Sequence, residues 1–63
     1  MKKEDVIEIM IYTVNNYNIE GAEKAGLTYE QIQNMLDSTR PGLIEMFNLI
    51  YDDLVKNGVL QAE

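Results

Sequence analysis

The stretch between Gly26 and Gly58 contains the clearest helix boundaries in this chain. Thr28 is a good N-cap residue, and Gln31 follows three positions later, which completes the pattern of a capping box. In such a box, the cap and the third helical residue each satisfy a backbone N–H of the other with a side-chain oxygen. The pattern therefore predicts a helix that begins at residue 28 and runs to about Leu36.

A second boundary is predicted inside this stretch, at residues 37–40. The short polar side chains of this segment, DSTR, compete for backbone hydrogen bonds and so favour a turn. Pro41 suits the first turn of a following helix, where its missing N–H needs no partner. Gly58 suits the left-handed residue that ends such a helix. The sequence thus predicts a break at 37–40 and a separate helix over 41–57.

The N-terminal part of the chain predicts one long helix and one short one. Apolar residues recur at helical spacing over residues 2–17. The asparagines at positions 15, 16 and 18 have low helix propensity and are expected to end this helix. Residues 18–25 then predict a short helix that stops at Gly26, with a loop over 18–26 as the alternative. We therefore predict an all-α fold, a single helical domain over 1–63 built as a small bundle of three to four helices, with residues 61–63 frayed.

Each predicted helix has an apolar face that is expected to form the core. Helix 41–57 is the most apolar, and Phe47 lies at the centre of its stripe, which predicts a central core position. Its apolar residues cover about half of the helix surface, which predicts that other chain segments cover it on two sides. The other expected core residues of helix 41–57 are Leu43, Ile44, Met46, Ile50, Tyr51, Leu54 and Val55. Those of the other helices are Val6, Ile7, Met10, Ile11, Val14, Tyr17, Ile19, Ala22, Tyr29, Ile32, Met35 and Leu36.

The composition excludes several kinds of site. The chain contains neither cysteine nor histidine, so it forms no disulfide and no Cys/His zinc site, and it lacks two of the residue types most used as catalytic bases and nucleophiles. We therefore expect a protein that is not an enzyme and holds no metal or cofactor. No segment reaches the ~18 apolar residues of a membrane span. The first residues lack the apolar region of a signal peptide, so we expect a cytoplasmic location.

Charge and size point to a protein partner. The net charge is −6, which repels a phosphate backbone and favours a neutral or basic protein surface. A chain of 63 residues is marginal alone and often needs a partner subunit. We predict a homodimer built on helix 41–57, with helix 2–17 contributing. The residues expected to bind protein, because the predicted core does not need them, are Ile9, Tyr12, Glu45, Leu49 and Asp52.

Ala22, Gly26 and Ile32 match the alanine, glycine and aliphatic positions of the helix-turn-helix motif, and the chain resembles the DNA-binding regulators that carry it. In this register the resemblance implies that helix 28–36 is the recognition helix. The side chains that it would offer to the major groove include Gln31, Gln33 and Asn34. Glutamine and asparagine read adenine edges there.

The same region also resembles a winged helix in a second register. The segments LTYEQIQNML, DSTRPG and LVKNGVL match that family's order of helix, Ser/Thr-Arg turn and glycine-closed helix. Helix 41–57 would then read DNA with Gly42, Glu45 and Asn48. Over Ala22 to Leu60, without a β-hairpin wing, either register implies a helix-turn-helix-like core. The alternative function is thus a compact transcriptional regulator that contacts DNA through Gln31, Gln33, Asn34 and Arg40. The function that the sequence favours over this alternative is an interaction module without catalysis (a subunit, adaptor or inhibitor).

Overall fold

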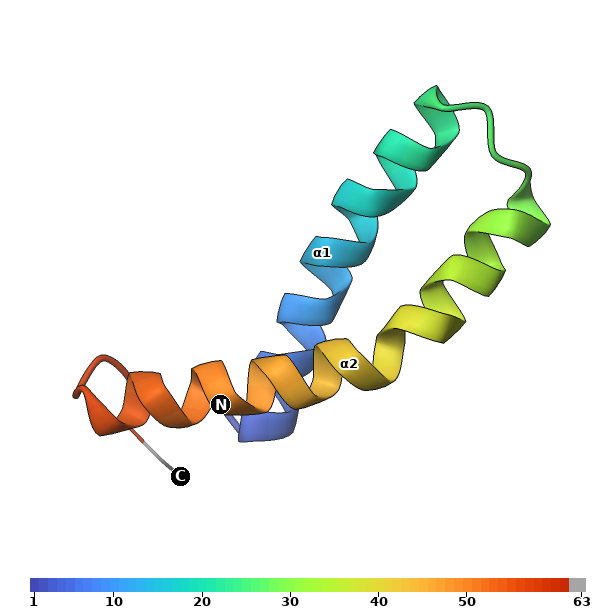
Figure 1. Cartoon of the computed structure of the whole chain (residues 1–63). Helices are drawn as coiled ribbons and strands as arrows, with labels where there is room; N and C mark the ends of the chain where they lie inside the picture. Colours follow the sequence, from blue (N-terminus) through green and yellow to red (C-terminus); the bar gives the residue numbers. More distant parts are fainter. Residues whose placement is uncertain (62–63) are drawn as a thin grey trace.

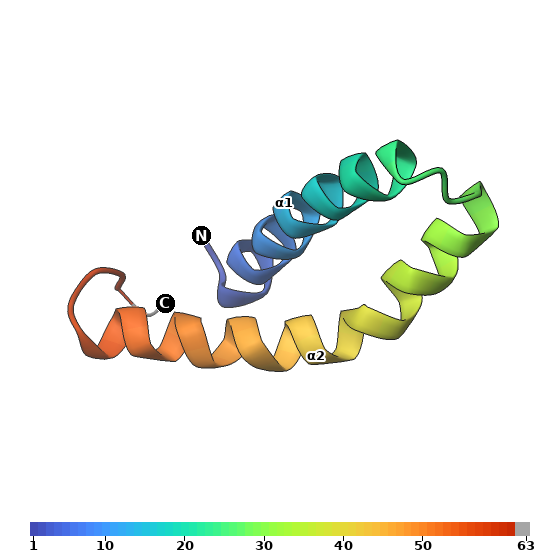
Figure 2. The ribbon, with the colours of Figure 1, turned by 45° about the horizontal axis from the view of Figure 1, so that its top comes forward.

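The computed structural model describes residues 1–61 and consists of two long helices joined by a tight turn (Figure 1). α1 covers Lys3–Lys24 and α2 covers Tyr29–Lys56. The first half of α2 runs back beside the second half of α1, and the second half of α2 crosses the start of α1 (Figures 1 and 2). The predicted all-α class is confirmed for residues 1–61, which contain no strand. Of the residues predicted to be frayed, Gln61 is exposed and belongs to no helix, and Ala62 and Glu63 lie outside the described residues.

The predicted bundle of three to four helices with a helix-turn-helix-like core is wrong, because the chain forms a hairpin of only two helices over residues 1–61. The predicted helices 2–17 and 18–25 are parts of α1, which continues through all three asparagines and through Gly21. Each asparagine costs a helix only a few tenths of a kcal/mol, and Gly about 1 kcal/mol. Once a helix has nucleated, such costs do not stop it when the residues beyond add hydrogen bonds and packing.

The predicted helices 28–36 and 41–57 are likewise parts of one helix, α2. The hydroxyl of Ser38 donates a hydrogen bond to the carbonyl of Met35 at 3.0 Å, and the hydroxyl of Thr39 donates one to that of Leu36 at 3.3 Å. These bonds reach back three residues and are compatible with helical backbone, so the polar side chains do not break the helix. The turn that the winged-helix register needs at 37–40 is therefore absent.

Pro41 lies inside α2 and not at the start of a new helix. Proline has no N–H to donate to the carbonyl four residues earlier, and its ring pushes against that carbonyl, which bends a helix. Figures 1 and 2 show α2 bent near its middle. The bend lets the two halves of α2 contact different parts of α1 within one continuous helix.

The predicted helix boundaries at Thr28, Gly26 and Gly58 are confirmed. The Thr28 N–H donates to Gln31 Oε1 at 2.8 Å, and the Gln31 N–H donates to Thr28 Oγ1 at 3.2 Å, which is a complete capping box. Gly26 and Gly58 have φ angles of +83° and +76°, the left-handed conformation that favours glycine. The N–H of Val59 donates to the carbonyl of Leu54 at 2.9 Å, as in a Schellman motif.

The core lies where the second half of α2 crosses α1. Ile7, Ile11 and Phe47 form its buried cluster, which confirms the central position predicted for Phe47. The other buried side chains among the described residues are Ala22, Ile32 and Tyr51. Tyr17 and Tyr29, which were also expected in the core, are about four-fifths exposed, at 80% and 79%. Two helices enclose less space than a bundle, so the outer flanks of the predicted apolar faces remain in water.

Candidate protein-interaction surface

One side of the helix crossing is polar and held by ion pairs. Lys3 Nζ lies 3.0 Å from Asp52 Oδ1 and 5.5 Å from the centre of the Tyr51 ring. Arg40 lies 2.6 Å from Glu8 Oε1. Exposed pairs of this kind stabilise a fold by at most about 1 kcal/mol each, so their main effect is to fix the orientation of the two helices.

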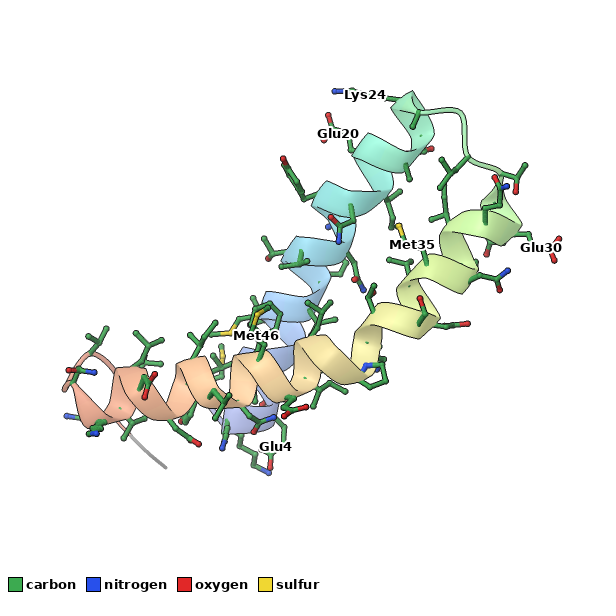
Figure 3. All side chains as sticks on the ribbon, viewed as in Figure 1. Glu4, Glu20, Lys24, Glu30, Met35 and Met46 are labelled. Carbon is green, nitrogen blue, oxygen red and sulfur yellow. The ribbon has the colours of Figure 1, made fainter. Side chains whose placement is uncertain are left out.

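A shallow groove lies on this polar side. Its volume is about 200 Å³, and it is lined by Lys3, Glu4, Ile7, Glu8, Ile44 and Asn48. Figure 3 shows Glu4 below α2 in this view. The groove thus extends between α1 and the second half of α2 on the side that carries the ion pairs.

The other side of the crossing carries apolar side chains, which we call the apolar face: Val6 and Met10 from α1, and Leu43, Met46 and Ile50 from α2. Met10 and Leu43 are half-buried and pack against the core cluster. Met46 and Ile50 are 46% and 38% exposed. The apolar face therefore continues the core outward into water.

Helical spacing places the members of the apolar face away from the groove. Successive residues of a helix are about 100° apart, so residues two positions apart point to nearly opposite sides. Met46 is two residues before Asn48, and Val6 is two residues before Glu8, and both Asn48 and Glu8 line the groove. Figure 3 shows Met46 above α2, on the opposite side from Glu4. The crossing thus has a polar side and an apolar side.

The chemistry of the apolar face suits a protein surface. None of its five members carries a charge or a polar side-chain group that would need a hydrogen-bond partner. Two of them are methionines, whose unbranched and polarisable side chains adapt to the shape of a partner. Grouped apolar side chains in water differ from scattered single ones, because contiguous patches mark interaction sites.

The predicted protein-binding residues do not share one surface. Ile9 lies between the buried Ile7 and Ile11, so it points away from α2 and is 53% exposed. Leu49 lies between the buried Phe47 and Tyr51, so it points away from α1 and is 62% exposed. The two side chains therefore lie on opposite outer sides of the hairpin. A single flat contact reaches only one of them.

The remaining predicted binding residues also lie on different parts of the surface. Tyr12, 68% exposed, is one residue after the buried Ile11 on α1, and Glu45 is two residues before Phe47 on α2. Asp52 is engaged by Lys3 on the polar side. Met46 and Ile50 were assigned to the core from their spacing and were not counted as binding residues. The unusual width of the apolar stripe on this helix was the signal that pointed to them.

The residues of the DNA-binding alternative also separate. Gln31, Gln33 and Asn34 lie near the start of α2, whereas Arg40 pairs with Glu8 at the crossing. The side-chain oxygen of Gln31 accepts the capping-box bond from Thr28, and Gln33 is half-buried. Asn34 is the one of these three side chains that is both exposed and outside the capping box.

Neither helix in residues 1–61 is long and apolar enough to cross a lipid bilayer. The same part of the chain contains no cluster of three or more acidic side chains arranged to hold a metal ion. Comparison with protein-family models, with curated proteins and with solved structures finds no match to this chain.

Proposed function

We propose that this chain is a small, non-enzymatic protein-interaction module (a subunit, adaptor or inhibitor) that binds protein through the apolar face. The observation that carries this proposal is the exposure of Met46 and Ile50 directly beside the buried cluster. Removing such side chains from water is favourable by roughly 25 cal/mol for each Å² of apolar surface that a partner covers.

The charged groups at the crossing support a structural role for the polar side. Lys3, Glu8, Arg40 and Asp52 are engaged in ion pairs between the two helices. Their side chains hold α1 against α2, so the apolar face has a fixed shape on the other side of the same crossing. A preformed surface loses less conformational entropy on binding than a disordered one.

A capture experiment tests this proposal. A tagged copy is produced together with an untagged copy in the native cell, and the proteins that it retains are quantified by mass spectrometry. We expect at least one protein in an amount comparable to the bait. Met46→Glu should lose that protein, because it would place a charge in an apolar contact.

Tyr12→Glu is the matched control, since it adds the same charge at an apolar side chain that is 68% exposed and lies two residues after Met10, so it points away from the apolar face. It should retain the captured protein. Equal capture by both variants, or no protein captured in a comparable amount by the wild type, would count against the apolar face as the binding surface.

A further inference from the structure

We infer that a second copy of this chain covers the apolar face, in a two-fold contact in which α2 of one copy packs against α2 of the other. This inference rests on the proposed function and names its partner. Met46 and Ile50 are the most exposed members of the face, and both belong to α2. The centre of the contact is therefore placed on this helix.

The exposed area of the single chain is larger than that of a compact monomer, by about the area that one partner would cover. A compact monomer of 7.2 kDa is expected to expose about 4,100 Å². The hairpin exposes 4842 Å². The surplus of about 700 Å² is close to the ~800 Å² that each partner contributes to an interface of standard size. The shape agrees, because the radius of gyration is 14.0 Å, against about 11 Å for a compact domain of this length.

The charge distribution permits two copies to meet at this face, although each has a net charge of −6. Glu8 and Asp52 are drawn to Arg40 and Lys3 on the polar side of the crossing. Glu45 is two residues before the buried Phe47, so it points to the outer side of α2. These carboxylates stay in water when the apolar faces of two copies meet. Asp53 is exposed and lies three residues after Ile50, so it is placed at the rim of the contact.

Two-fold symmetry determines which residues face each other in the contact. In such a contact the same patch is used by both copies, so Met46 and Ile50 of one chain face Met46 and Ile50 of the other. Each substitution then acts twice, once in each copy. The resulting assembly has four helices and encloses the flank of the core that one hairpin leaves open.

Sedimentation equilibrium on the purified chain tests this inference. We expect the wild type to be a dimer at high micromolar concentration and Met46→Glu to be a monomer. Tyr12→Glu should remain a dimer, because Tyr12 is 68% exposed and lies two residues after Met10, so its charge points away from the apolar face. If Met46→Glu loses helical circular dichroism, Met46→Ala takes its place. Met46→Ala should raise the dimer dissociation constant by about tenfold or more, since apolar contact is lost in both copies.

Three results would overturn the inference. A wild-type monomer at high micromolar concentration excludes the second copy, and if the capture experiment still retains another protein, the proposed function stands without self-association. A dimer that Tyr12→Glu dissociates and Met46→Glu leaves intact places the contact on the side of the hairpin opposite to the apolar face. A dimer that tolerates both changes places it on a different surface.

Discussion

At the scale of single residues, Phe47 joins the two helices into one core. It is 7% exposed and forms the buried cluster with Ile7 and Ile11. We expect Phe47→Ala to lower the free energy of unfolding by about 3–5 kcal/mol, because the lost ring leaves a cavity. That amount is a large part of the total stability of a 63-residue chain, at about 0.05–0.15 kcal/mol per residue.

Chemical denaturation at a fixed protein concentration, followed by circular dichroism, checks this prediction. Leu49→Ala is the control, since Leu49 lies on the same helix and is 62% exposed. It should change the free energy of unfolding by less than about 0.5 kcal/mol. Equal losses in the two variants would show that the Phe47 side chain is not the centre of the core.

At the scale of helices, the glycine that ends α2 can be compared with one inside it. Gly58 has a φ of +76°, so Gly58→Ala should lower the free energy of unfolding by roughly 1 kcal/mol. Gly42 lies within α2, and a Cβ added there meets nothing within 4 Å. Gly42→Ala should therefore raise stability, by about 0.5–1 kcal/mol. Thermal denaturation of each variant measures whether its stability rises or falls. A stabilising Gly58→Ala would contradict the left-handed cap.

The helix ends were predictable from sequence, but the number of helices was not. Capping boxes and left-handed glycines depend on a few neighbouring residues, so Thr28, Gly26 and Gly58 could be identified locally. Whether a helix continues past a weak segment depends on what it packs against. Pro41 fits both the start of a helix and the bend of a longer one, because its φ is helical in either case. In this chain the helix continues through Pro41 and bends, because both halves of α2 then contact α1.

The candidate surface was predictable only in part, for the same reason. Helical spacing identified Met46 and Ile50 as apolar-face residues of their helix, but a bundle would have covered both side chains. In the hairpin only one neighbouring helix is present, and both side chains remain partly in water. Ile9 and Leu49 were correctly predicted to lie off the core, but their opposite directions become clear only once α1 and α2 face each other.

At the scale of the whole molecule, the proposed dimer brings together two chains of net charge −6, for a total of −12. Added salt shortens the range of their repulsion from about 10 Å at 0.1 M to about 3 Å at 1 M. We therefore expect the dissociation constant of the dimer to fall as sodium chloride is raised, which sedimentation at several salt concentrations would measure. A dissociation constant that rises with salt would indicate a contact held by opposite charges instead of by the apolar face.

The measurement that tests the central claim most directly is cross-linking between copies at Met46. The chain contains no cysteine, so Met46→Cys introduces a single thiol in each copy. Packed helices have axes about 8–10 Å apart, so a short bis-maleimide should join two thiols at the proposed contact. We predict a cross-linked dimer for Met46→Cys and little for Tyr12→Cys, whose thiol lies two residues after Met10 and points away from the apolar face. Efficient cross-linking through Tyr12→Cys but not through Met46→Cys would contradict the account.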